Sequence, residues 1–393
     1  MLTAALPDPV ARLHALPASA RILLSPPQLT GAELEAVRQS LEAGWLAPAG
    51  PTPRAFERAI AQATGIPHVV AVSSGTSALH LGYRCLDLAP GDEVWAPGLT
   101  FVATVAPAVQ MGARVRFLDV CPRSWTLDPD LLRRELRAGA ERGALPRVVV
   151  PVDIFGQSCD LDAILSACAG WGVPVMTDSA EALGAMQRGR HAGVGARLAA
   201  FSFNGNKIIT AGGGGALAAD DPVLIERARL LAAQAREPAA HYQHETTGYS
   251  YGLSSVLAAV GLAQLPTLFA RVAARRAIFE RYVAGLADLP GLSFMPEPAW
   301  SRSTRWLTAV QIDPARFGAD REAVRLALDA AGIESRPVWK PLPLQPAFRG
   351  APVAGGAVAA RLFEHGLCLP SGSGLTEEAQ GRVIAAIRRC HGA

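Results

Sequence analysis

Residues 68–86, HVVAVSSGTSALHLGYRCL, change from one secondary-structure pattern to another within the stretch. The apolar, β-branched run HVVAV is typical of a buried strand, and TSALHLGYRCL is typical of a helix. The junction between them is SSG, at residues 73–75. A buried strand that runs directly into a helix is the repeating unit of an α/β fold.

The same alternation of apolar runs and helical patterns continues to about residue 220. Apolar runs of this length, separated by helices, predict a mainly parallel sheet that is covered on both faces, which is a doubly wound α/β domain. A helical stretch at about 254–289, interrupted at Pro266, leads into a mixture of further strand and helix patterns. We therefore expect an N-terminal arm at 1–28, a large α/β domain at 29–265 and a smaller C-terminal α+β domain at 266–393. The apolar runs in the large domain are DEVWAP, ARVRFLD, PRVVVPVD, VPVMTD, LAAFSF and GGGALAAD.

Composition narrows the classes of partner. The formal net charge is only +3 over 393 residues and no block of like charge occurs, so nothing favours binding to nucleic acid or to a membrane. Apolar runs stay well below the roughly 20 residues of a membrane span, and prolines interrupt the N-terminal segment, which does not resemble a signal peptide. The six cysteines lack metal-type spacing, so we expect buried thiols, no metal site and a cytoplasmic protein.

Polar groups stand at the ends of four of the predicted strands. Ligands of an open parallel sheet bind at the carboxyl ends of its strands, so these positions are the first candidates for a site. They are SSGTS at 73–77, Asp153, Asp178, and Ser202 with Lys207.

Lysine is rare in this chain, and this rarity singles out Lys207. The chain has only two lysines, Lys207 and Lys340, and all of its other Lys or Arg positions are arginine. Arginine stays protonated, whereas a buried lysine can become a free amine and attack a carbonyl. A solvated surface lysine is the alternative. The position of Lys207 in FSFNGNKIITAGGGG, next to a strand and a glycine run, favours a catalytic amine.

Two further groups, a helix start and an aspartate, stand beside Lys207 as candidates for the same site. The N–H groups of Gly75, Thr76 and Ser77 would open a helix and attract an anion, although an ordinary N-cap made by Ser74 or Thr76 is the alternative. Asp178 ends an apolar strand and needs a partner there: it either caps the following segment or faces a protonated ring nitrogen. An anion site, a strand-end aspartate and a lysine together predict a site for pyridoxal 5'-phosphate.

Five motifs, in this order and spacing, resemble the sugar aminotransferases of the DegT/DnrJ/EryC1/StrS family. They are SSGTSALHL, PGDEVWAPGLTFVAT, TDSAEALGA, FSFNGNKIIT and GYSYGLSSVLAAVGLAQL, and the resemblance covers about residues 22–390. It implies a fold-type I transferase dependent on pyridoxal phosphate, with a mainly parallel, seven-stranded sheet between helices. Within the family, PAGP, SRPVWKPLPLQPAF and LCLPSGS look most like the enzymes that aminate C4 of UDP-4-keto-6-deoxy-N-acetylglucosamine in bacillosamine synthesis.

The resemblance also implies roles for single residues. Lys207 would be the Schiff-base lysine and general base, and Asp178 would hold the pyridine nitrogen protonated. Phe101 would stack on the ring, with core packing as its alternative, and Arg336 would meet the nucleotide sugar, with a surface ion pair as its alternative. The other implied cofactor contacts are Gly75, Thr76, Ser77, Glu181 and Ser202, and the other implied substrate contacts are Trp45, Leu46, Ala47 and Trp339.

Three positions depart from the family pattern. Ser250 stands where asparagine commonly reaches the phosphate of the other subunit in a homodimer with shared active sites, and Gly252 stands where arginine is usual. Pro343 replaces a frequent histidine. Lys207 is present, which separates the chain from the dehydratase branch, where histidine replaces the lysine.

The expected enzyme moves an amino group from L-glutamate to a nucleotide-linked keto sugar, with pyridoxamine 5'-phosphate as the second form of its cofactor. A GDP-linked 4-keto sugar of the perosamine type, or a 3-keto sugar, is an alternative substrate. A non-catalytic regulator of the same fold is a more distant alternative. An NAD-dependent enzyme is disfavoured because no GxGxxG follows the first strand.

Overall fold

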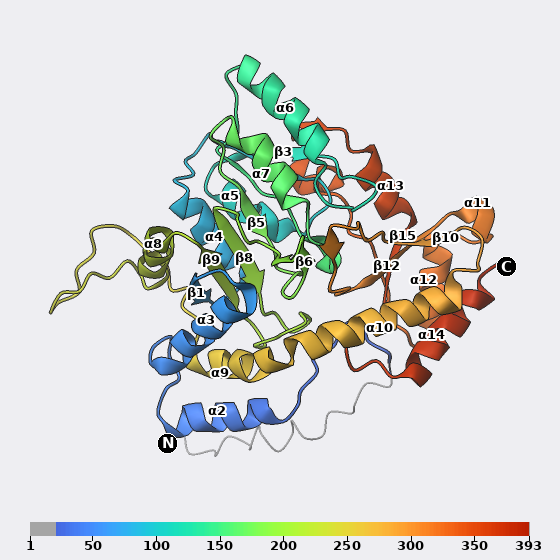
Figure 1. Ribbon diagram of the computed structural model, residues 1–393, viewed down its shortest axis with the longest axis horizontal. Helices are drawn as coiled ribbons and strands as arrows, with labels where there is room; N and C mark the ends of the chain where they lie inside the picture. Colours follow the sequence, from blue (N-terminus) through green and yellow to red (C-terminus); the bar gives the residue numbers. More distant parts are fainter. Residues whose placement is uncertain (1–20, 393) are drawn as a thin grey trace, which may run out of the picture.

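The computed structural model describes residues 21–392, and its central feature is one sheet between layers of helices (Figure 1). Two ladders, β1-β9-β8-β5 and β14-β3-β2-β4, are joined by parallel bridges from Val149 to Val175 and from Val152 to Asp178. Only β9 runs antiparallel to its neighbours, so the predicted mainly parallel sheet is confirmed. The strands are β1 (His68–Val72), β2 (Glu93–Pro97), β3 (Arg114–Leu118), β4 (Val148–Val149), β5 (Met176–Asp178), β8 (Leu198–Ser202), β9 (Gly215–Ala219) and β14 (Val353–Ala354).

Strand β1 of this sheet is apolar on both sides because each side meets a separate core. Val69 and Ala71 of β1 pack in a core with α3 and α9, whereas Val70 and Val72 pack in a core with α4 and α8. Side chains alternate along a strand, so consecutive apolar residues are needed where helices cover both faces. The helices of this part are α2 (Ala32–Glu42), α3 (Pro51–Thr64), α4 (Gly75–Cys85), α5 (Ala106–Gln110), α6 (Pro129–Glu141), α7 (Leu161–Ala169), α8 (Pro222–Ala232) and α9 (Ser255–Gln264).

The C-terminal part has its own antiparallel sheet, β10-β12-β15-β13, and its own core with α10, α12 and α14. It also contributes β14 to the edge of the large sheet, beside β3. A small ladder, β11-β6-β7, lies between the two parts. The elements are β6 (Met186–Gln187), β7 (Arg190–His191), α10 (Leu268–Leu286), β10 (Leu292–Phe294), β11 (Ser301–Arg302), β12 (Thr308–Ile312), α11 (Pro314–Phe317), α12 (Arg321–Ala330), β13 (Arg336–Pro337), α13 (Ala357–His365), β15 (Gly366–Leu369) and α14 (Glu377–Arg389).

One helical run, Ser255–Leu286, bridges the two parts through a 3-10 turn at Leu265–Thr267. By length and a mean hydropathy of 1.6 it could cross a membrane, but a core helix passes the same test. Arg275 lies within this run, is buried, and donates hydrogen bonds to the carbonyl oxygens of Trp306 and Ser371. These contacts favour a core helix.

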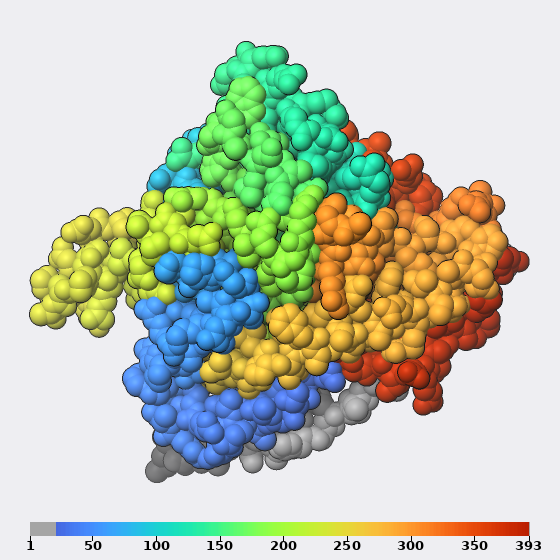
Figure 2. Space-filling view, in the orientation of Figure 1, coloured from blue at the N-terminus to red at the C-terminus, as the bar shows by residue number. Residues whose placement is uncertain are grey.

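The first described residues connect the C-terminal part of the chain to the loop before Lys207. Ile22 forms a bridge with Ile333, and Ser25 Oγ donates a hydrogen bond to the carbonyl oxygen of Asn206. Residues 1–20 of the predicted arm lie outside the described residues. The segment between α8 and α9 projects from the body of the molecule (Figure 2). All six cysteines are free, and four of them are buried.

Candidate active site

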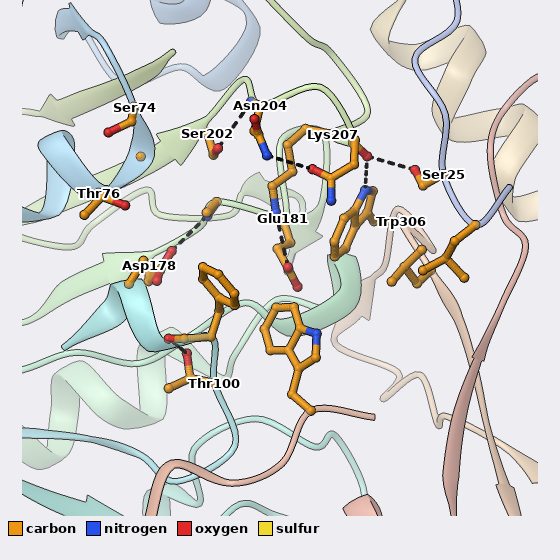
Figure 3. A pocket seen from close by; sticks show the side chains of 18 of the residues that line it. Ser25, Ser74, Thr76, Thr100, Asp178, Glu181, Ser202, Asn204, Lys207 and Trp306 are labelled. Carbon is orange, nitrogen blue, oxygen red and sulfur yellow. Dashed lines mark hydrogen bonds and ion pairs between the residues drawn. The ribbon is translucent and has the colours of Figure 1, made fainter. Parts of the chain in front are cut away.

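A cavity of about 610 Å³ lies where three of the four polar strand ends meet. The start of α4, Asp178 at the end of β5, and Ser202 with Lys207 after β8 all line it (Figure 3). Trp306 and Trp339 close it from the C-terminal part of the chain. The fourth strand-end group, Asp153, does not line the cavity. Among residues 21–392 no cluster of His, Cys, Asp and Glu forms a metal site.

One end of the cavity is formed by the first turn of α4. The Oγ of Ser74 accepts the N–H of Ser77 at 3.0 Å, so Ser74 is the N-cap of this helix. Gly75 and Thr76 line the cavity next to Ser202, whereas Ser77 is buried and its hydroxyl pairs with the serines before the helix. A side chain at Gly75 would place its Cβ 3.0 Å from Ser202 Cβ, so glycine lets the strand end approach the helix start. A helix N-terminus with two hydroxyls beside it suits a phosphate group.

Asp178 presents a buried carboxylate to the cavity. Thr104 Oγ1 donates to its Oδ2 at 2.6 Å, and the N–H of Ala180 donates to its Oδ1 at 3.2 Å. Burial raises the pKa of Asp178, while these two donors and the charge of Lys207 lower it in part. A buried carboxylate of this kind suits a protonated ring nitrogen, because the charge pair would compensate its lost hydration.

Lys207 is held inside the cavity, and its side chain is only 14% exposed, which argues against a solvated surface lysine. Its Nζ lies 3.2 Å from Glu181 Oε1 and 4.1 Å from the centroid of the Trp306 ring (Figure 3). The other oxygen of Glu181 accepts the N–H of Phe155 at 2.7 Å. Burial raises the pKa of Glu181 to about 7, although the charge of Lys207 and the Phe155 N–H oppose this shift. The amine therefore has an acidic neighbour whose charge changes near neutral pH.

The wall of the cavity opposite the sheet is aromatic. Phe101 lines it and is 56% exposed, so core packing does not describe its environment in this chain. Its ring lies 5.5 Å from that of Trp339, which also contacts the ring of Phe155. Arg336 lines the cavity as well, yet its guanidinium pairs with Glu334 at 2.9 Å, as its alternative interpretation requires.

Besides the buried Ser77, four of the predicted site residues lie outside this cavity, on a surface that joins the end of α2 to the start of α9. They are Trp45, Leu46, Ala47 and Ser250, and the first two expose large apolar side chains. The N–H of Ser255 donates to the carbonyl oxygens of Leu46 and Ala47, which brings the two segments together.

Gly252, the second departure in this region, has a steric cause. A Cβ at this position would lie 2.6 Å from Pro48 Cβ, so the arginine that is usual in the family would displace the turn after α2. The two departures Ser250 and Gly252 therefore belong to one local arrangement with residues 45–48.

Several residues of the site were not predicted from the sequence. Trp306 and Glu334 lie outside the quoted family motifs, and Thr104 and Asn206 lie inside them without an assigned role, because their contribution depends on which atom each meets in the fold. The indole N–H of Trp306 donates to the Asn206 carbonyl at 2.8 Å, a contact between residues 100 positions apart. The one available signal was the adjacency of Asn206 to Lys207.

Comparison with known proteins identifies the family of this chain. Residues 27–388 match the DegT/DnrJ/EryC1/StrS aminotransferase family. The chain belongs to this family. The protein is therefore an aminotransferase that uses pyridoxal 5'-phosphate, and helix α4, Asp178 and Lys207 offer the groups that this cofactor requires.

Individual relatives span nearly the whole chain. The Bacillus subtilis (strain 168) protein EpsN, named as a pyridoxal phosphate-dependent aminotransferase, is 45% identical over 93% of this chain and 94% of its own. GDP-perosamine synthase of Caulobacter vibrioides is 35% identical over 93% of this chain and 97% of its own. The solved PLP-form of Spr1654 of Streptococcus pneumoniae, named as a sugar aminotransferase, has a TM-score of 0.85 and 27% identity over 94% of this chain and 98% of its own.

Proposed function

We propose that this aminotransferase moves an amino group from L-glutamate to C4 of a nucleotide-linked 4-keto-6-deoxy sugar, with UDP-4-keto-6-deoxy-N-acetylglucosamine as the favoured substrate. The product would be a 4-amino-4,6-dideoxy sugar for surface glycans, made in the cytoplasm. The observation that carries the proposal is the meeting of Lys207, Asp178 and the N-terminus of α4 in one cavity. The preference for the UDP sugar rests on the motifs at 48–51, 335–348 and 367–373.

Lys207 and its neighbours account for proton transfer. Bound pyridoxal phosphate supplies an electron sink for the carbon that loses or gains the amino group. Lys207 Nζ would hold the cofactor covalently and, when free, would move the proton at the substrate carbon. Glu181 Oε1 holds the free amine at 3.2 Å. Asp178 would hold a proton at the ring nitrogen, and the hydrogen bond from Thr104 fixes the orientation of its carboxylate.

The remaining cavity residues bind and orient. Gly75, Thr76 and Ser202 would bind the phosphate through the N-terminus of α4 and two hydroxyls. Phe101 would cover one face of the ring, and Trp339 would limit the space beside it. Arg336 would bind the nucleotide sugar once its ion pair with Glu334 opens, which gives the substrate a charge-assisted partner.

A GDP-linked 4-keto sugar is the second candidate substrate. The 35% identity to a GDP-perosamine synthase supports it. Pro343, which removes a histidine donor of the family pattern, also weakens any assignment to a single sugar nucleotide.

Two half-reactions test the function. Bound pyridoxal phosphate should lose its visible absorbance when 15N-labelled L-glutamate is added and regain it when the keto sugar is added. Mass spectrometry should then find 15N in the amino sugar product. A panel of UDP- and GDP-linked 4-keto and 3-keto sugars then identifies the acceptor. Transfer to a GDP sugar alone would overturn the UDP assignment, and failure with glutamate would overturn the donor.

We also propose that the enzyme is a homodimer in which Ser250 and residues 45–47 serve the partner's site. Their common surface position outside their own cavity supports this. Co-expression of Lys207→Ala and Ser250→Asp chains tests it. Each variant alone should be inactive, and a mixed dimer should regain activity because it contains one intact site. Two inactive variants that stay inactive together in verified mixed dimers would argue against shared sites.

A further inference from the structure

The indole of Trp306 contacts both the amine and the backbone of the catalytic loop. Trp306 is 3% exposed, and the centroid of its ring lies 4.1 Å from Lys207 Nζ. Its N–H donates at 2.8 Å to the carbonyl oxygen of Asn206, the residue that precedes the lysine. One side chain from the C-terminal part therefore fixes the lysine at both of its ends (Figure 3).

Trp306 is itself held by a buried cation. The Nη1 of Arg275, which is 2% exposed, donates to the Trp306 carbonyl at 2.5 Å and to the Ser371 carbonyl at 2.9 Å. Its Nη2 donates to Ser25 Oγ at 3.1 Å, and Ser25 Oγ donates to the same Asn206 carbonyl that accepts the indole N–H. Arg275 therefore ties the backbone of Trp306 to Ser371 and Ser25, and Ser25 shares the Asn206 carbonyl with the indole.

From these contacts we propose that Trp306 is a positioning residue for the free amine of Lys207. The ring face attracts the ammonium form through its quadrupole, and this attraction is strongest between side chains that are largely buried, as Lys207 and Trp306 are. Glu181 and Trp306 then hold Nζ between them, so that the amine stays beside the reacting carbon after it leaves the cofactor. The proposal rests on the proposed role of Lys207.

The contact itself is testable in the cofactor-free protein. Because the chain has only two lysines, 13C-lysine labelling gives two sets of side-chain signals, and Lys340 is an internal reference. The ring current of the indole should move the Cε protons of Lys207 upfield of those of Lys340. Trp306→Leu should abolish the displacement, Trp306→Phe should keep part of it, and Trp339→Leu should leave it in place. An unchanged Lys207 signal in Trp306→Leu would overturn the proposal.

The consequence for catalysis is tested in the half-reaction with L-glutamate. We expect Trp306→Leu to lower its limiting rate by about tenfold, with a much smaller effect on the glutamate concentration for half-saturation, and Trp306→Phe to restore most of the rate. Borohydride trapping of the cofactor on Lys207 verifies that each variant is folded and loaded. An unchanged limiting rate in a Trp306→Leu protein that has lost the displaced signal would overturn the positioning role.

These readouts separate the proposal from the proposed function. The NMR signal needs neither cofactor nor substrate, so it reports on the contact even if the sugar is wrong. Failure of trapping on Lys207 in the unaltered protein would remove the proposed function, and the positioning role with it, whatever the NMR signal shows.

Discussion

Asp153 and Asp178 are neighbours at the ends of adjacent strands, yet their carboxylates have different surroundings. The N–H of Asp153 donates to the carbonyl oxygen of Asp178. The two residues are only 1% and 5% exposed. Burial raises the pKa of both. Asp153 is surrounded by protein donors from Ser179 and Cys159, whereas Asp178 faces the cavity. Burial and a raised pKa are therefore common to both carboxylates, and the open side of the Asp178 carboxylate is what distinguishes the proposed catalytic residue.

The largest expected effect is on catalysis. Asp178→Asn should lower the rate of the glutamate half-reaction by roughly 10²–10³-fold, as for other buried electrostatic contacts to a reacting group. Asp153→Asn is the matched control and should change this rate less than threefold in the folded fraction. Stopped-flow absorbance measures both, and equal losses in the two variants would erase the distinction.

The second effect concerns stability and pH. Burial raises the pKa of Asp153 to about 6 from an ordinary value of 3.8. The contribution of the neutral carboxyl group to the free energy of unfolding is therefore fully present below about pH 4 and is lost as the pH rises through 6. Asp153→Asn stays neutral, so its free energy of unfolding relative to the unaltered protein should rise by about 2 kcal/mol from pH 4 to pH 7. Urea unfolding of the cofactor-free protein measures this, and a flat difference would show that Asp153 is ionised without cost.

The hydroxyl donors of the two aspartates give a smaller, paired test. Thr104→Val removes the 2.6 Å donor to Asp178 and should lower the rate about fivefold, the value of roughly one hydrogen bond, while Thr104→Ser should retain most of the rate. If Thr104→Ser loses as much as Thr104→Val, the methyl group rather than the hydroxyl matters.

The corresponding change beside Asp153 is Ser179→Ala. It removes a 2.6 Å donor and should lower the free energy of unfolding by about 1 kcal/mol, with the rate kept within twofold. Thermal unfolding and the glutamate half-reaction, measured on the same preparation, show which property changes. A rate loss as large as that of Thr104→Val would place Asp153 in the catalytic network.

The sequence predicted the sheet and the meeting of polar strand ends because both follow from local patterns. Apolar runs between helices required the parallel order, and Lys207 and Asp178 stood out by rarity and by polarity in apolar surroundings. Asp153 shared that polarity, and only the fold shows that its carboxylate points away from the cavity. Trp306 could not be predicted, because its role depends on Arg275 and Asn206, which are distant from it in the sequence.

The substrate side of the site was harder to predict for a different reason. Trp45, Leu46, Ala47 and Ser250 came from family resemblance alone, and they lie outside the cavity of their own chain. Their proposed role needs a second subunit, so neither local pattern nor the fold of one chain determines it. Arg336 was placed at the cavity, but its ion pair with Glu334 depends on the strand geometry around them.

The central claim is that the lysine in this cavity binds the cofactor, and the two-lysine sequence allows a direct test. The protein loaded with pyridoxal phosphate is reduced with borohydride, digested and mapped by mass spectrometry. The account predicts the cofactor on Lys207 and an unmodified Lys340. Cofactor on Lys340, or on neither lysine of a fully loaded protein, would contradict it.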